Sequence, residues 1–309
     1  MSGGKKRILY IVSGILGGVL AFAGIELLFF LNSPGYFLFT LLQGAVVGAA
    51  LGLSLGVVDD IAYSRLKLGI IRGSVSGLLT AVISAGVMVL AAQLYLLLAG
   101  AADAVRFDSF AGAPAGDSSL QSPEFLSLVS RSAGWMLIGM ASGAVSGFRR
   151  GSSRRFWAGI LGGALGGLIG GVVLELLLRS AEGGLSAMTA RLSGFLILGA
   201  VLGFALGEFE RRLSFARLRV LTGANKNREY LLSGRETAIG SHMNAGVYLG
   251  DYEKILPRHA LVVRNGEDMI LKSDAGDVRI NDGGLEGSSI LKYQDVIQLG
   301  QAKLLLLQP

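Results

Sequence analysis

Cysteine is absent from this 309-residue chain, and histidine occurs only twice. Without cysteine there is no disulfide, no thiol nucleophile and no cysteine-ligated metal. The two histidines, His242 and His259, have no acidic partner at ligand spacing, so we expect neither a zinc site nor a general base. The glycine-rich runs lack the GK[ST] ending of a phosphate-binding loop. The sequence therefore predicts a protein that is not an enzyme and that holds no metal or cofactor.

Charged residues are also scarce. They make up 16% of the chain, whereas hydrophobic residues make up 51% and glycine alone contributes 47 residues. Ordinary soluble domains carry about a quarter of their residues as charges, so much of this chain is expected to lie in a lipid bilayer. The net charge is +6, but the basic residues stand at the ends of apolar runs, not on one face with interleaved aromatics. Nucleic acid is therefore not an expected partner.

Six apolar runs approach the length of about 20 residues that crosses a bilayer. They are Ile8–Leu31, Phe37–Val58, Ser74–Leu98, Ala133–Phe148, Phe156–Leu178 and Leu192–Gly207. The first is longer than the apolar segment of a signal peptide, about 7 to 15 residues, so we interpret it as a retained span. The fourth is short. Its helix is expected to begin earlier, with Ser122 as N-cap and Pro123 at the first helical position.

Lysine and arginine gather at alternate ends of these spans. Clusters at 5–7, 65–72, 149–155 and 211–219 fall on one side, and single arginines fall on the other (Arg106, Arg131, Arg179 and Arg191). The positive-inside rule makes the clustered side cytoplasmic. With six spans every cluster falls on that side, so we predict an inner-membrane protein with both termini in the cytoplasm.

The spans repeat a glycine pattern. GAVVGAALG at 44–52 recurs as GAVLGFALG at 199–207, identical at seven of nine positions, and GMASGAVSG at 139–147 keeps the spacing. SGILGG at 13–18 similarly matches AGILGG at 158–163. Glycine at every fourth position lies on one helix face and lets two backbones approach closely. We predict a membrane α-helical bundle of six transmembrane helices built from three glycine-zipper hairpins. The glycine faces serve either within one chain or between the chains of a homo-oligomer.

After Gly207 the composition changes to short alternating apolar runs, such as EYLLSG, ALVVRNGEDMILK and VIQLGQAKLLLL, which predict β-strands. Asn265-Gly266 and Gly300-Gln301 are hairpin signals. The predicted organisation is a basic cytoplasmic N-terminus (1–7), a six-span domain (8–207), a helical linker (208–217) and a cytoplasmic all-β sandwich (218–309).

A series of short motifs runs through the last 92 residues. In order they are Ile239-Gly240, Val247-Tyr248-Leu249, Pro257-Arg258-His259-Ala260, Gly276 with Ile280-Asn281-Asp282-Gly283, and QDVIQLG at 294–300. In order and spacing they resemble a forkhead-associated (FHA) domain, with its S-R-x-H-A, G-T-x-V-N-G and closing G-D-x-I-x-L-G motifs. The resemblance implies a cytoplasmic β-sandwich, a fold that in many relatives binds phosphothreonine peptides.

The chain departs from the FHA pattern where that ligand would bind. The phosphate-binding arginine is replaced by Ser241, the serine three before the histidine by Leu256, and the threonine after the loop glycine by Asp277. Phosphothreonine carries about 1.5 to 2 negative charges, which a carboxylate repels. We therefore do not expect ordinary phosphothreonine binding, although Arg258, Lys254 and His242 are alternative cations. The predicted peptide-binding face comprises Ser241, Leu256, Arg258, Asp277 and Asn281.

Three of the retained FHA positions are structural. The resemblance implies that His259 forms hydrogen bonds within the sandwich and holds the neighbouring loops, that Gly240 ends a strand, and that Gly283 shapes a turn with Asn281.

Two carboxylates fall inside the spans. Glu26 and Glu175 lie late in the first and fifth runs, at comparable positions of two repeats. Ionisable residues within spans are costly and suggest function, so both are candidates for an intramembrane ion site. The other interpretation is that both reach the outer membrane interface.

These observations predict a multi-pass membrane protein whose FHA-like domain binds a protein partner, phosphorylated or not, as a membrane-anchored signalling or scaffold component. The alternative is a small-solute transporter or channel that its FHA-like tail regulates. Internal repeats are common in transporters.

Overall fold

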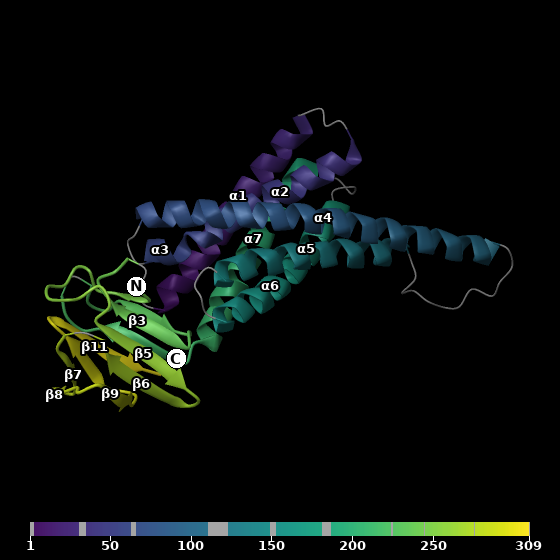
Figure 1. Cartoon of the computed structure of the whole chain (residues 1–309). Helices are drawn as coiled ribbons and strands as arrows, with labels where there is room; N and C mark the ends of the chain where they lie inside the picture. Colours follow the sequence, from purple (N-terminus) through teal and green to yellow (C-terminus); the bar gives the residue numbers. More distant parts are fainter. Residues whose placement is uncertain are drawn as a thin grey trace. The chain divides into compact units, whose positions relative to one another are not determined.

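A computed structural model describes residues 3–30, 35–62, 66–110, 123–148, 153–180, 187–223, 225–243, 245–274 and 276–308. The chain forms a helical unit, 6–149 with 156–209, and a second unit that includes 210–309 and holds all the described strands (Figure 1). The helices are α1 (Gly3–Phe30), α2 (Tyr36–Gly56), α3 (Val58–Ala62), α4 (Leu66–Phe110), α5 (Pro123–Phe148), α6 (Ser153–Ser180) and α7 (Ala187–Leu213).

Five helices of the described part are long and apolar enough to cross a membrane. The apolar segments are Lys5–Phe30, Tyr36–Ala62, Lys67–Leu94, Phe156–Ser180 and Ala187–Arg212. The predicted fourth span lies in α5, a helix of 26 residues that does not reach the same apolarity. This helix begins at Pro123 as predicted, and Ser122 lies outside the described residues.

The repeated glycine motifs lie where two helices meet backbone to backbone. A Cβ placed on Gly44, Gly139 or Gly199, the first glycine of each motif, would collide with the carbonyl oxygen of Ser84, Gly163 or Gly14, respectively. Four residues later, Gly48, Gly143 and Gly203 face the carbonyl oxygens of Thr80, Gly159 and Tyr10 in the same way. We call these three contacts the glycine seams; they join α2 to α4, α5 to α6, and α7 to α1.

The glycine seams align the three repeats in a different register from the one that the SGILGG and AGILGG motifs suggest. Each seam joins one predicted hairpin to the next, because the second helix of one pair packs on the first helix of the following pair. In this register Gly14 corresponds to Gly163. The SGILGG and AGILGG motifs instead align Gly14 with Gly159, one helical turn away. Low-complexity glycine spacing fits both registers, and only the packing distinguishes them.

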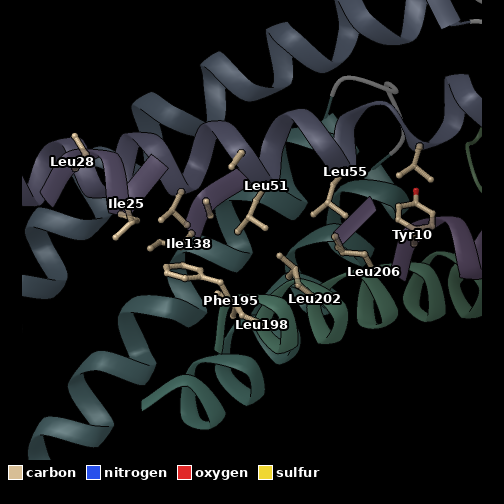
Figure 2. Packing of buried hydrophobic residues seen from close by; sticks show 14 residues of the cluster. Tyr10, Ile25, Leu28, Leu51, Leu55, Ile138, Phe195, Leu198, Leu202 and Leu206 are labelled. Carbon is tan, nitrogen blue, oxygen red and sulfur yellow. The ribbon is translucent and has the colours of Figure 1, made fainter. Parts of the chain in front are cut away.

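Larger side chains fill the space between the seams. The buried cluster draws on α1, α2, α3, α5 and α7, and Figure 2 shows Ile25, Ile138 and Phe195 next to one another within it. Leu51, Leu55 and Leu202 are each at most 1% exposed. Lipid tails are as apolar as leucine, so this packing is stabilised by van der Waals contact more than by the hydrophobic effect.

The end of the bundle where α1 begins carries buried ion pairs. Lys6 Nζ lies 2.7 Å from an Asp59 carboxylate oxygen, and Arg72 lies 2.8 Å from that of Asp60. Lys6 is 6% exposed. Helix α1 begins at Gly3 and so includes most of the predicted basic N-terminus (1–7), and Lys6 packs against an α3 carboxylate.

The second unit is a sandwich of two sheets, ordered β2-β1-β11-β10-β7-β8 and β4-β3-β5-β6-β9. The strands are β1 (Ala216–Val220), β2 (Glu229–Leu232), β3 (Glu236–Gly240), β4 (Val247–Tyr248), β5 (Ala260–Asn265), β6 (Asp268–Ser273), β7 (Val278–Ile280), β8 (Gly283–Gly284), β9 (Ser288–Leu291), β10 (Val296–Leu299) and β11 (Ala302–Leu307). Both predicted hairpins are confirmed: Asn265 pairs with Asp268, and Leu299 pairs with Ala302. Gly266 and Gly300 have positive φ, as such turns require.

The predicted helical linker (208–217) is wrong at its C-terminal end. The helix ends at Leu213, where the Ser214 hydroxyl donates to the carbonyl of Arg211. The sheet begins at once, because the amide of Phe215 donates to Leu232 and β1 pairs with both β2 and β11. The alternation of buried and half-buried residues in ARLRV identifies this strand from Ala216 onward.

A leucine at Gly143 should destabilise the bundle, because its side chain would occupy the space held by the backbone of Gly159. Overpacking of this kind costs about 1–3 kcal/mol. We expect Gly143→Leu to lower the thermal unfolding midpoint of the purified full-length protein in detergent. Gly86→Leu is the matched control, since nothing lies within 4 Å of a Cβ there. Equal midpoints for the two variants would contradict the packing role of the seams.

Candidate functional site

The predicted peptide-binding residues lie on two loops that main-chain hydrogen bonds join. The amide of Ser241 donates to the carbonyl of Leu256 (2.9 Å), and the amide of His242 donates to that of Pro257 (3.1 Å). Gly240 permits this approach, because a Cβ there would collide with the carbonyl of Pro257. The structure therefore brings Ser241 and Leu256 together at one end of the sandwich.

His259 joins these loops to a third. It is 2% exposed; its Nδ1 accepts from the amide of Leu256 and its Nε2 lies 3.2 Å from the carbonyl oxygen of Asp277. These partners assign the neutral tautomer with the proton on Nε2. Gly276 packs against the imidazole, where a Cβ would not fit. The imidazole thus holds the Leu256 and Asp277 loops in place.

We call Ser241, Met243, Leu256, Arg258 and Asp277 the recognition face. Its charged residues are engaged in ion pairs: Arg258 Nε lies 2.5 Å from Asp274, and Asp277 lies 3.1 Å from Arg279 Nη2. Leu256 and the neighbouring Met243 are 41% and 61% exposed. The face therefore offers paired charges and apolar side chains in place of an open cationic pocket.

The side chain of Asn281 forms its hydrogen bonds with residues outside the recognition face. Its amide nitrogen donates to Asp295 (2.7 Å), and its amide oxygen accepts from the main chain of Val296 (2.9 Å). Asn281 adopts a positive φ of 50°, a conformation that asparagine tolerates better than most residues. These bonds fix the turn between β7 and β8, and Gly283 follows the turn as the first residue of β8, paired with Ile280.

Tyr252 is a supporting residue that the sequence patterns did not single out. Its hydroxyl donates to the carbonyl of Thr222 (2.6 Å) and accepts from the amide of Asn225, whose side chain donates to Asp251. The phenol therefore ties the loop that leads to Leu256 to the loop between β1 and β2. Burial is the main cause that raises the pKa of Tyr252 above its ordinary value.

The two carboxylates predicted to fall inside the spans form ion pairs within the helical unit. Glu26 lies 2.7 Å from Arg191 Nε, and Glu175 lies 3.2 Å from Arg131 Nη1. Trp135 also donates to Glu175. Both arginines line one cavity of about 520 Å³, at the end of the bundle where α1 ends and α2 begins. The ion pair between Arg191 and Glu26 joins residues 165 positions apart.

The sandwich with this loop arrangement is an FHA-like domain. The protein-family model that matches residues 219–309 is described as the inner membrane component of the type III secretion system (T3SS), cytoplasmic domain. The match covers the C-terminal third of the chain. No curated protein matches the chain.

Solved structures match about a third of the chain. The FHA domain of the CT664 protein from Chlamydia trachomatis is 30% identical over 31% of this chain and 99% of that one, with a TM-score of 0.28. The cytoplasmic domain of the T3SS sorting platform protein PscD from P. aeruginosa is 20% identical over 31% and 81%, with a TM-score of 0.28. The N-terminal FHA domain of S. cerevisiae Rad53p, in complex with a phosphothreonine peptide, is 14% identical over 31% and 94%, with a TM-score of 0.29.

Removal of the His259 imidazole should destabilise the sandwich strongly. His259→Ala leaves the Leu256 amide and the Asp277 carbonyl without their partner and opens a cavity. We expect a loss of about 2–4 kcal/mol in urea unfolding of the segment 214–309. The control is His242→Ala at an exposed position, with an expected change within about 0.5 kcal/mol. Similar losses for both histidines would contradict the assignment.

The raised pKa of Tyr252 predicts a pH dependence. The neutral phenol is favoured in the fold, so its contribution is fully present below the unfolded value of about 10 and is lost as pH rises through the higher folded value. Tyr252→Phe should therefore cost about 1 kcal/mol near neutral pH, with a difference from wild type that shrinks at alkaline pH. A difference that stays constant or grows between about pH 8 and pH 11 would contradict this.

Proposed function

We propose that this chain is a multi-pass inner-membrane scaffold component whose FHA-like domain binds a protein partner through the recognition face, without a requirement for phosphothreonine. The observation that carries the proposal is the chemistry of that face. A phosphate needs cationic and hydroxyl donors, whereas the corresponding positions hold Ser241, Leu256 and the carboxylate of Asp277.

The ion pairs of the recognition face support this interpretation. An incoming phosphate would share Arg258 with Asp274 or Arg279 with Asp277, two carboxylates whose side chains are 43% and 69% exposed. Either arrangement would place the phosphate dianion beside an exposed carboxylate. Met243 and Leu256 instead offer apolar contacts that are independent of phosphorylation, and methionine adapts readily to varied partner surfaces.

For the membrane part we infer six spans with both termini in the cytoplasm. Helix α5 packs on α6 through Gly139 and Gly143, as closely as α7 packs on α1, which supports its inclusion in the bundle. An even number of spans is needed if all the basic clusters are to lie on the same side of the membrane. A single bundle with internal seams also accounts for the glycine-zipper repeats without a second chain.

The family match supports a role for this chain in a membrane-bound protein assembly. It describes an inner membrane component of a secretion apparatus, and we infer for this chain a comparable role as a membrane anchor that recruits proteins to an assembly. The transporter alternative depends on Glu26 and Glu175, and both carboxylates form ion pairs with arginines. A structural role accounts for them without transport.

Substitutions on the recognition face should abolish partner capture. Affinity-tagged full-length protein in mild detergent is incubated with lysate, and the recovered proteins are compared before and after phosphatase treatment. We expect one set of partners, unaffected by phosphatase and lost with Met243→Asp/Leu256→Asp. The matched control is Ile290→Asp, at a 57% exposed position on the edge strand β9.

Two outcomes of this experiment would overturn the proposal. Recovery that disappears after phosphatase treatment would show phosphate-dependent recognition. Recovery that Ile290→Asp abolishes and the recognition-face variant leaves unchanged would move the partner to the edge strand.

A further inference from the structure

The cavity is lined by residues of α1, α2, α4, α5, α6 and α7, so all three repeats contribute to it. Tyr36, Arg131 and Arg191 each stand eight residues before the first glycine of their motif, and all three line the cavity. Thr40, Trp135 and Phe195 stand four residues before those glycines and line it too. The cavity is therefore formed by equivalent positions of all three repeats.

The two ion pairs are also formed by equivalent positions of two repeats. Glu26 follows Gly14 by 12 residues, and Glu175 follows Gly163 by 12 residues, where Gly14 and Gly163 are equivalent in the seams. The third repeat places Leu96 and Tyr36 at these positions. Two repeats thus each direct one guanidinium to the same cavity, and the third contributes a phenol.

The carboxylates lie deeper than the arginines they hold. The side chain of Glu175 is 6% exposed and that of Arg131 is 50% exposed; the corresponding values are 19% for Glu26 and 26% for Arg191. An arginine has five N–H donors in a planar fork, so one held by a carboxylate on one side can bind a second anion on another. The polar part of the cavity lining therefore includes the guanidinium groups of Arg131 and Arg191.

Most of the remaining lining is apolar, and Thr40, Gln43 and Glu175 are further polar members of it. Ile25, Phe29, Val47, Met88, Leu174 and Leu178 surround the cavity, and its volume lies within the range of about 300–1,000 Å³ that is typical of ligand sites. In a bilayer the surrounding solvent is acyl chain, so an apolar cavity there gains dispersion contact from a hydrocarbon occupant.

We propose that this cavity binds one membrane amphiphile, with its acyl chain among the apolar residues and an anionic phosphate or carboxylate head group at Arg131 and Arg191. The proposal rests on the membrane embedding proposed above and is independent of the recognition face. Loss of amphiphile binding therefore leaves partner capture by the FHA-like domain unaffected, and the two proposals fail separately.

Trp135 provides a reporter inside the cavity. The chain has two tryptophans, and Trp157, which is 57% exposed, does not line the cavity. In full-length Trp157→Phe protein, amphiphiles with brominated acyl chains quench Trp135 when they occupy the site. The probes are brominated phosphatidylglycerol, brominated stearic acid and brominated diacylglycerol, each titrated in nonionic detergent.

We expect saturable quenching by an anionic probe and weak, unsaturable quenching by diacylglycerol. Quenching by phosphatidylglycerol identifies a phospholipid ligand, and quenching by stearic acid alone identifies a free fatty acid. Arg131→Gln/Arg191→Gln should weaken the binding by about tenfold or more, because hydrogen bonds to charged groups are lost. Arg179→Gln, at the same end of the bundle and outside the cavity lining, should leave it unchanged.

A second variant tests the proposal independently in case the arginine variant fails to fold. Ala92→Phe fills the cavity and leaves both ion pairs intact, so it should abolish saturable quenching in a folded bundle. The proposal is overturned if quenching is equally saturable with diacylglycerol, if no probe gives saturable quenching, or if Ala92→Phe binds as wild type does.

Discussion

The close approach of two backbones at the glycine seams is the constraint on which the helical unit depends. At Gly139 and Gly143 the facing surface is the main chain of α6 itself, so no side chain fits between the helices. In a bilayer such contact compensates for the missing hydrophobic effect, because close backbones gain van der Waals energy that lipid cannot supply. The seams fix the register of neighbouring helices, and that register places the arginines and glutamates of distant segments within ion-pairing distance.

In the FHA-like domain, hydrogen bonds to one buried side chain fix the positions of neighbouring segments, as the glycine seams do in the helical unit. Buried His259 replaces water as the partner of two main-chain groups on separate loops. The loops of the recognition face are consequently held in place although Ser241, Leu256 and Asp277 stand where the FHA pattern has an arginine, a serine and a threonine. The imidazole contacts main-chain groups of these loops, so its role does not depend on a ligand.

Much of the C-terminal fold was predictable because its signals are local. Asn265-Gly266 specifies a turn by its own backbone preferences, and the FHA motifs occur in order. The strand at Ala216 was missed by two residues, since Arg217 and Arg219 gave it the appearance of a charged helix end. Their charges are balanced across the sheet by Glu229, which pairs with both. That contact depends on strand pairing that no local pattern displays.

The membrane site was less predictable for the same reason. Glu26 and Glu175 were recognisable as costly residues, but their partners lie 165 and 44 positions away, and the equivalence of the two pairs appears only in the seam register. Tyr252 has no motif at all; its role depends on a hydrogen bond to Thr222 across a loop. Sequence patterns identify which residues are unusual, whereas packing determines what they contact.

We propose that the FHA-like domain of this chain does not recognise phosphothreonine. The most direct measurement is an NMR titration of the ¹⁵N-labelled segment 214–309 with a phosphothreonine peptide and with its unphosphorylated counterpart. The account predicts that the amides of Ser241, Arg258 and Asp277 respond equally weakly to both peptides. Saturable shifts at these amides with the phosphorylated peptide alone would contradict it.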